Sequence, residues 1–285
     1  MNPYQQFVSR FTDAIREGKS FPLGDFAPAP KPSIAAGAPK AIFFSPHPDD
    51  ECISGGIAVR LLREAKMNVF NVAVTQGSKK ERQAERLREL EGACKYLGFG
   101  LITTGLNGLE KVNPKTRAQD STHWSACVKV IARILEQHQP RIIIFPHEHD
   151  WNSTHIGTYF LVMDALKEMP SDFEPFLVET EFWGQMTDPN LMLEISMQDL
   201  TDMISALTFH VGEVQRNPYH VLLPAWMLDN VRRGAELVGG QGAAAPDFTF
   251  AALNRLRRWR GRKAEKVFEG GKHVSASTNI GELFK

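Results

Sequence analysis

Short apolar runs alternate with amphipathic stretches along the chain from residue 40 to residue 182. The apolar, β-prone runs predict strands over residues 42–44, 69–75, 101–103, 141–146 and 176–182. Apolar residues at helical spacing predict helices over residues 57–66, 80–96, 121–138 and 153–169. This alternation predicts an α/β fold with a Rossmann-like, doubly wound and mostly parallel sheet. The simplest strand order is 3-2-1-4-5, with helices on both faces.

The two ends of the chain differ in composition from this central part. Residues 1–39 predict an N-terminal helix and a Pro-rich connector, and residues 40–238 hold the α/β domain. Residues 239–285 begin with a Gly- and Ala-rich linker and end in a polar tail. Between them lies a basic stretch whose apolar stripe, from Leu253 to Trp259, predicts a helix. We expect the N-terminal helix to dock on the body of the protein or on another subunit of a homo-oligomer.

The charges of the chain balance, with 33 basic and 33 acidic residues. Because no net field attracts nucleic acid or an anionic membrane, we expect neither as a partner. The three cysteines, Cys52, Cys94 and Cys127, are odd in number and widely spaced, which is typical of reduced thiols and indicates a cytoplasmic location. The first residues are polar and amphipathic, so we expect no leader peptide and no membrane span.

The first predicted strand ends on a cluster of one histidine and three acids, His47-Pro48-Asp49-Asp50-Glu51. A helical apolar stripe follows, so the cluster lies in the loop between a strand and its crossover helix, where open α/β sheets bind ligands. His47 and Asp50 can offer a nitrogen and an oxygen to one catalytic zinc ion, with Asp49 facing the water that it activates. Alternatively, the three acids only cap the following helix. Cys52 is either a further ligand or a small buried residue.

The predicted sheet order places the fourth strand beside the first, with the topological switch point between them. A site that begins after the first strand should therefore be completed after the fourth. Three histidines follow the fourth strand within nine residues, namely His147, His149 and His155. We expect His155 to be the third metal ligand, because the first turn of a helix holds a side chain more firmly than a loop does. Of His147 and His149, which lie two positions apart on extended backbone, we expect only one to face the cleft.

These motifs resemble those of the PIG-L family, also called LmbE-like, of zinc-dependent N-acetylglucosaminyl de-N-acetylases. Residues 45–56 are similar to the family's HPDDE and Gly-Gly motif, and residues 150–157 take the place of its D-x-H-x-D-H element. The resemblance extends over roughly residues 40–235 and includes Arg86 and the segment that ends at His210. It implies a hydrolase in which metal-activated water removes an N-acetyl group from an N-acetylglucosamine-type sugar or sugar conjugate.

The resemblance also implies a role for each residue of the first motif and for His155. The zinc ligands would be His47, Asp50 and His155. Asp49 would be the general base, and Glu51 would be structural, because its hydrogen bonds would tie the loop down.

The chain departs from the family pattern at Asn152 and Thr154. At these positions the family commonly has a histidine that stabilises the oxyanion and an acid that pairs with it. Asn152 can donate a hydrogen bond to a developing oxyanion, but it cannot act as a general acid. The residue that protonates the leaving amine is therefore left open among Asp49, His149 and His210.

Substrate recognition depends on less specific residues. Arg86 would contact a substrate hydroxyl or an anionic group, or else lie on a solvated helix face. Trp151, with Trp183 and Trp226, would stack on a sugar, although a tryptophan in an α/β protein more often packs in a core or an interface. Two other functions stay open: an amidase that acts on a larger thiol or peptide conjugate, and a non-catalytic carbohydrate- or nucleotide-binding module.

Overall fold

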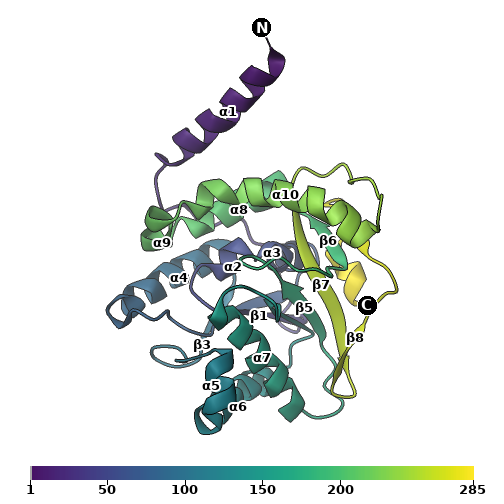
Figure 1. Cartoon of the computed structure of the whole chain (residues 1–285). Coiled ribbons are helices and arrows are strands. Elements are labelled where there is room, and N and C mark those ends of the chain that lie inside the picture. The colour runs from purple at the N-terminus through teal and green to yellow at the C-terminus, as the bar shows by residue number, and fades with distance from the viewer. Residues whose placement is uncertain (1) are drawn as a thin grey trace.

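A computed structural model describes residues 2–285 of the chain. Within these residues the strands form one sheet, and helices pack on both of its faces (Figure 1). The strands are β1 (Lys40–Ser45), β2 (Asn68–Ala73), β3 (Gly100–Thr103), β4 (Ile142–Pro146), β5 (Phe176–Thr180), β6 (Leu191–Glu194), β7 (Ala251–Arg260), β8 (Lys263–Lys266) and β9 (Lys272–Val274). They follow the order β3-β2-β1-β4-β5-β7-β6-β9, and β8 pairs with β7 outside this path.

The half of the sheet from β3 to β5 is parallel and confirms the predicted order 3-2-1-4-5. β1 lies at its centre, between β2 and β4, and pairs in parallel with both. All of β4, and all of β1 after Lys40, is buried, as expected for strands that helices cover on both sides. The carboxyl ends of β1 and β4 are therefore neighbours at the predicted switch point.

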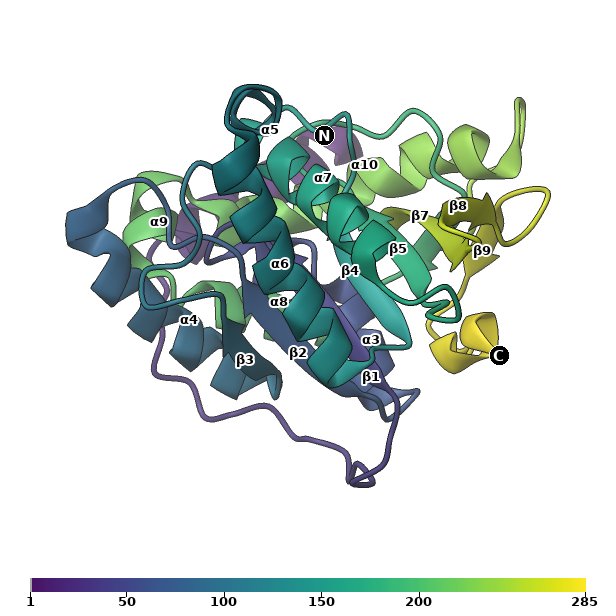
Figure 2. The same cartoon turned by 90° about the horizontal axis from the view of Figure 1, so that it is seen from below.

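Two layers of helices enclose the sheet (Figures 1 and 2). These helices are α2 (Asp50–Ile53), α3 (Gly56–Arg63), η1 (Lys80–Arg82), α4 (Gln83–Leu97), α5 (Pro114–Gln119), α6 (Ser121–His138), α7 (Ser153–Glu168), α8 (Met197–Leu207), α9 (Val211–Arg216) and α10 (Tyr219–Gly239). Phe43 of β1 faces the layer with α3, α4 and α8, whereas Ile42 and Phe44 face α6 and α7, because side chains alternate along a strand. No helix among residues 2–285 combines the length and the apolar character that crossing a membrane requires.

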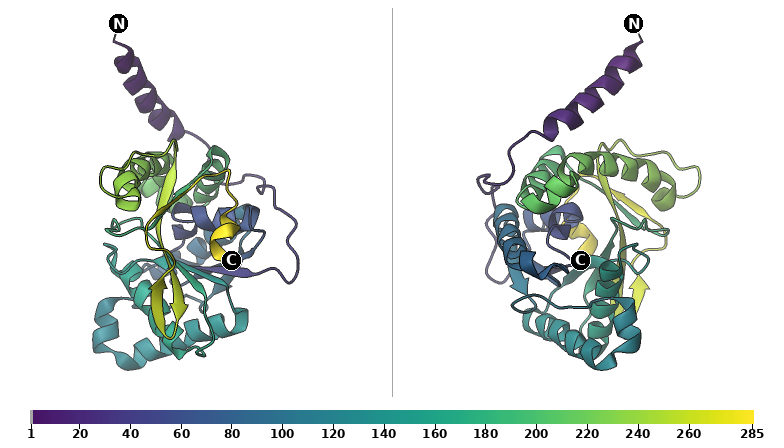
Figure 3. Two further views of the ribbon diagram at one scale, coloured as in Figure 1. Left: turned by 90° about the vertical axis from the view of Figure 1, so that its right-hand side faces the viewer. Right: turned by 60° about the vertical axis from the view of Figure 1, so that its left-hand side comes forward.

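The predicted basic helix after residue 239 is wrong. Residues 251–260 form β7, which lies antiparallel between β5 and β6, and β8 folds back on it as a hairpin (Figure 3). Along β7, Arg255 and Arg257 donate to the buried carboxylate of Glu179 on β5. The apolar spacing from Leu253 to Trp259 fits either a helix or a strand, and the cross-strand partner decides between them. The C-terminal part of the chain therefore completes the sheet.

The N-terminal helix is confirmed as α1 (Pro3–Gly18), and it stands away from the body (Figures 1 and 3). Its end near Gly18 lies against Val221 of α10. Phe7 and Phe11 pack edge to face on each other, yet they remain 59% and 46% exposed. The face of α1 that carries Phe7 and Phe11 therefore does not dock on the body in this structure. Its docking on another subunit stays a prediction. The connector over residues 19–39 is extended, as its prolines predict.

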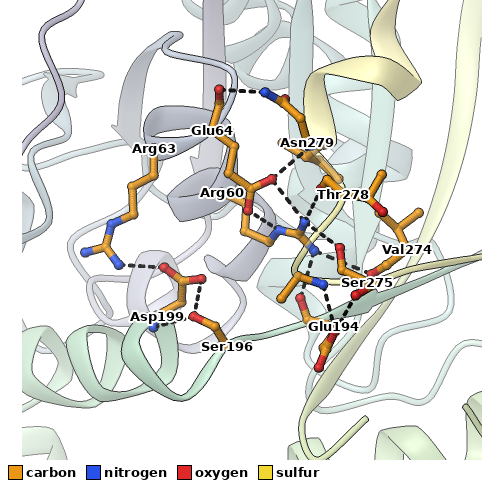
Figure 4. A network of polar contacts seen from close by, with 12 residues as sticks. Arg60, Arg63, Glu64, Glu194, Ser196, Asp199, Val274, Ser275, Thr278 and Asn279 are labelled. Carbon is orange, nitrogen blue, oxygen red and sulfur yellow. Dashed lines mark hydrogen bonds and ion pairs between the residues drawn. The ribbon is translucent and has the colours of Figure 1, made fainter. Parts of the chain in front are cut away.

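Arg60 of α3 is fully buried and ties the C-terminal segment to the core (Figure 4). Its guanidinium pairs with Glu64 at 2.6 Å and donates to the backbone oxygens of Glu194, Ser275 and Thr278 at 2.7 to 2.9 Å. These acceptors belong to segments next to β6, β9 and the short helix η2 (Ile280–Phe284). Because a guanidinium carries five donors in a fixed fork, one side chain can hold all of these segments together.

We expect Arg60→Met to lower the free energy of unfolding by about 3 kcal/mol, because Glu64 and three partly buried carbonyl groups then lose their donor. Urea unfolding followed by circular dichroism measures this change. Arg232→Met, at an exposed arginine of α10, is the matched control and should leave the unfolding curve unchanged. Equal curves for the two variants would show that the Arg60 network does not hold the C-terminal segment in place.

Candidate metal centre

The loops after β1 and β4 bring together the three residues that the sequence predicts as metal ligands. His47 lies in the loop after β1, and Asp50 begins α2. His155 lies in the first turn of α7, as predicted. Each of the three side chains offers one ligand atom, and these three atoms lie within 4.8 Å of one another. Residues more than 100 positions apart in the chain thus meet at the switch point of the sheet.

The carboxylate of Asp50 lies between the two imidazole rings. Its Oδ2 is 3.3 Å from Nε2 of His155 and 3.6 Å from Nδ1 of His47. Burial alone would raise the pKa of Asp50, but the two imidazoles hold that pKa far below its usual range. Conversely, burial would lower the pKa of His155, but the charges of Asp50 and Asp150 raise it to about 10. The field at this point therefore favours a positive charge.

The donor atoms fit a divalent metal ion. Nε2 of His155 is buried and has no hydrogen-bond partner within the described part of the chain. A buried nitrogen without a partner is costly, and a bound cation would satisfy it. Two imidazoles and one carboxylate are also a known ligand set of catalytic zinc, which leaves a coordination position open. His47, Asp50 and His155 are therefore well suited to hold a divalent metal ion.

Asp150 lies behind His155, in a supporting role that the sequence did not reveal. Its Oδ2 is 3.6 Å from Nδ1 of His155, and its Oδ1 accepts a hydrogen bond of 2.8 Å from the backbone N–H of Asn152. A carboxylate in this position fixes the orientation of the ring, so that the other nitrogen faces the metal site. The acid stands five positions before His155, a spacing that indicates proximity only once the loop conformation is known.

Asp49, next to the candidate ligands, has an unusual backbone conformation. Its φ of 119° lies in a left-handed region that a residue with a Cβ rarely adopts. Its side chain lines the same cavity as His47 and Asp50. Burial, and then the charge of Asp50, raise the pKa of Asp49 well above that of an ordinary carboxyl group. A carboxyl group with a raised pKa can accept and return a proton near neutral pH.

Two of the candidate ligands, His47 and Asp50, line a cavity of about 610 Å³, whereas His155 is buried behind its wall. Asn152 lines the cavity and caps α7, because its Oδ1 accepts a hydrogen bond of 2.8 Å from the N–H of Thr154. This bond leaves the amide NH₂ of Asn152 as a donor for a ligand. Arg86 of α4 also lines the cavity, and its Nη2 donates to the backbone oxygen of Pro48 at 2.9 Å. Arg86 thus supports the first motif rather than lying on a solvated helix face.

Two aromatic residues form one wall of the cavity. Trp183 follows β5 and Tyr219 begins α10, and their ring centroids are 5.6 Å apart in an edge-to-face arrangement. Gly184 packs tightly on the second motif, since a Cβ at this position would stand 2.7 Å from Cα of Asp150. This close approach fixes the loop that carries Trp183 beside the metal site.

Several residues predicted for the site lie outside the cavity wall. Trp151 is 80% exposed and His149 is exposed, and neither lines the cavity. His147 is buried, with its Nε2 2.9 Å from the backbone oxygen of Gly184. The expectation that one of His147 and His149 faces the cleft is therefore wrong. His210 does not line the cavity either, and its buried imidazole contacts Glu51 instead.

The fold and the site together define an α/β protein with a candidate single-ion metal centre at the switch point of its sheet. Residues 42–166 match the sequence model of the PIG-L family, described as GlcNAc-PI de-N-acetylase. This segment contains both motifs, and over these residues the chain is similar to the PIG-L family. A comparison with curated protein sequences finds no match.

Solved structures of low sequence identity share the fold. GalB, the 4-carboxy-2-hydroxymuconate hydratase of Pseudomonas putida KT2440, is 15% identical with a TM-score of 0.58 over 76% of this chain and 95% of its own. The N,N'-diacetylchitobiose deacetylase of Pyrococcus horikoshii is 17% identical with a TM-score of 0.57 over 88% of this chain and 92% of its own. A zinc-inhibited form of the teicoplanin deacetylase Orf2 is 12% identical with a TM-score of 0.55 over 76% and 97%. At these identities the likeness establishes the fold.

We expect Asp150→Asn to weaken zinc binding by about 10- to 100-fold, because His155 then loses the carboxylate that orients its ring. Competition with a chromophoric chelator measures the affinity. Asp172→Asn, at an exposed aspartate in the turn after α7, is the control and should bind zinc as the unmodified protein does. Unchanged affinity in Asp150→Asn would mean that the ring of His155 is oriented by its packing alone.

Proposed function

We propose that the chain is a zinc-dependent hydrolase that removes an N-acetyl group from an N-acetylglucosamine-type sugar or sugar conjugate. The observation that carries this proposal is the meeting of His47, Asp50 and His155 beside a cavity that His47, Asp49 and Asp50 line. The match of residues 42–166 to the PIG-L family model supports the reaction class, since that model is described as a de-N-acetylase. A hydratase shares the fold, so the fold alone does not choose the reaction.

His47, Asp50 and His155 would hold the ion, which when bound supplies Lewis acidity and lowers the pKa of water. Asp49 accepts a proton from the attacking water on its carboxylate, for which its raised pKa and its place beside the ligands suit it. The oxygen of the water then bonds to the acetyl carbon. Hydrolysis ends when the C–N bond breaks, acetate leaves, and the free amine takes up a proton.

Two residues of the chain complete this scheme. The NH₂ group of Asn152, held in place by the helix cap, donates a hydrogen bond to the oxyanion that forms on the acetyl group. Asp49 returns its proton to the leaving nitrogen, since His149 and His210, the other candidates, do not line the cavity. One carboxyl group thus serves as base and then as acid. Asn152 takes over the oxyanion contact of the histidine that the family commonly has in the second motif.

The cavity wall fits a sugar. Trp183 and Tyr219 present aromatic surface beside the metal site, and the C–H face of a pyranose ring packs well on such surface. The bound sugar would direct its N-acetyl group towards Asp49, and the amide bond of that group would be hydrolysed. An amidase acting on a larger thiol or peptide conjugate would use the same centre and stays a second candidate for the substrate.

A panel of N-acetylated substrates tests the proposal. We expect the zinc-loaded protein to release acetate and a free amine from N-acetylglucosamine or one of its conjugates. Fluorescamine labelling detects the amine, and an enzymatic assay detects the acetate. Removal of zinc by dialysis against a chelator should abolish release, and addition of zinc should restore it. If no N-acetylated sugar yields acetate while a thiol or peptide conjugate is cleaved, the protein is an amidase and the proposed deacetylase function is wrong.

We expect Asp49→Asn to keep zinc but lower kcat by about 100-fold or more, because the amide cannot accept a proton from water. Metal analysis and initial rates measure the two effects separately. Asp229→Asn, at the exposed surface of α10, is the control and should hydrolyse substrate at the normal rate. Normal turnover in Asp49→Asn would remove Asp49 from the role of general base.

We expect Trp183→Ala to raise KM by about tenfold with little change in kcat, because it removes stacking surface that the bound sugar uses in ground state and transition state alike. Trp151→Ala is the matched control. Because Trp151 is exposed and lies outside the cavity wall, the KM of this variant should equal that of the unmodified protein. A rise in KM for Trp151→Ala alone would move the sugar site out of the cavity, towards the surface that Trp151 occupies.

A further inference from the structure

A buried pair of side chains, Glu51 and His210, lies beneath the proposed catalytic base. Nε2 of His210 is 2.6 Å from Oε1 of Glu51, and both side chains are fully shielded from solvent. The two residues are 159 positions apart in the chain. A fully buried contact of this length between a carboxylate and an imidazole is a strong, directional hydrogen bond. Neither residue lines the cavity, so neither is placed to touch a substrate.

The carboxylate of Glu51 gathers three donors. Its Oε2 accepts a hydrogen bond of 3.0 Å from the backbone N–H of Asp49. Its Oε1 accepts the N–H of His210 and also the S–H of Cys52, at 3.1 Å. Because a carboxylate has about four acceptor positions, it can serve all three donors at once. Glu51 thus connects His210 directly to the backbone of Asp49.

His210 occupies a rigid position. It lies between α8 and α9, and its backbone N–H donates to the oxygen of Leu207 at 3.1 Å. The ring of the preceding residue, Phe209, packs so closely on α4 that a Cβ at Gly92 would stand 2.7 Å from it. The imidazole of His210 is therefore held by α4, α8 and α9, which are separate from the loop that carries Asp49 and Glu51. Such a rigid donor can fix the orientation of a carboxylate.

We infer that His210 is a positioning residue: it orients Glu51, and Glu51 holds Asp49 in the left-handed conformation that presents its carboxylate to the cavity. This inference rests on the proposed role of Asp49 as the base. A φ of 119° is strained for an aspartate, and such a conformation persists only where the surroundings impose it. The hydrogen bond from the Asp49 N–H to Glu51 is the contact that imposes it here.

The two amide substitutions of His210 separate positioning from proton transfer. The NH₂ group of glutamine can take the place of Nε2 and donate to Glu51, whereas that of asparagine is too short to reach it. We expect His210→Gln to stay within about fivefold of normal kcat. His210→Asn should lose about 100-fold in kcat with KM and zinc content unchanged, because a small displacement of a catalytic group has an effect of this size. His220→Gln, at another buried histidine, is the control and should not change kcat.

A double-mutant cycle tests the connection through Glu51. If His210 acts through Glu51, the variant His210→Asn/Glu51→Gln should be no slower than the slower of its two single variants. If the fold-losses of the two single variants multiply in the double variant, the two residues act independently, and the inference would be overturned. Equal losses in His210→Gln and His210→Asn would also overturn it, because they would make His210 a proton carrier.

Amide hydrogen exchange at Asp49 tests the same inference without any substrate. The N–H of Asp49 should be protected in the unmodified protein and in His210→Gln, and exchange at least tenfold faster in His210→Asn. Unchanged exchange in His210→Asn would overturn the positioning role even if the protein is active. If the unmodified protein hydrolyses no N-acetylated substrate, the proposed function fails on that result alone, whereas the exchange rates still decide whether His210 positions Asp49.

Discussion

The contact of one carboxylate with two imidazoles depends on the neighbouring positions of two strands. Asp50 follows β1 and His155 follows β4, and their side chains approach within 3.3 Å because these strands pair side by side in parallel. If another strand lay between β1 and β4, the spacing between strands in a sheet would keep the two side chains about 5 Å further apart. The sheet order is thus the constraint on which the candidate metal centre, the cavity above it and the position of Asp49 all depend.

The parallel half of the sheet and the meeting of the three candidate ligands were accessible from the sequence because their signals are local or topological. Apolar runs such as residues 142–145 indicate buried strands, and the rule that ligands bind at a switch point links His47 to His155. The signals that failed are those that a distant partner decides. The stripe of β7 has an ambiguous spacing, and Glu179, the residue that pairs with its arginines, lies 76 positions away from Arg255. No local pattern reveals such a partner.

The same distinction explains the site residues that were misplaced. Trp151 stands next to a predicted ligand in the sequence but points to solvent, whereas Trp183 reaches the cavity because Gly184 packs against the second motif. Asp150 and His210 both act on their neighbours through single contacts whose geometry only the folded chain defines. Sequence spacing therefore identified the candidate ligands, while the neighbours that contact them became visible only in the packing of the folded chain.

The position of β7 has a consequence for the order in which the sheet can form during synthesis. β6 is made before β7, yet on the side towards β5 its neighbour in the sheet is β7. Until residue 260 has left the ribosome, the nascent chain therefore exposes the edge of β5, and β6 has no place to pair. An unpaired edge of this kind invites association with other chains. The proposed catalytic loops are synthesised well before that point. The nascent chain is therefore most prone to association late in synthesis, after these loops have formed and before β7 completes the sheet.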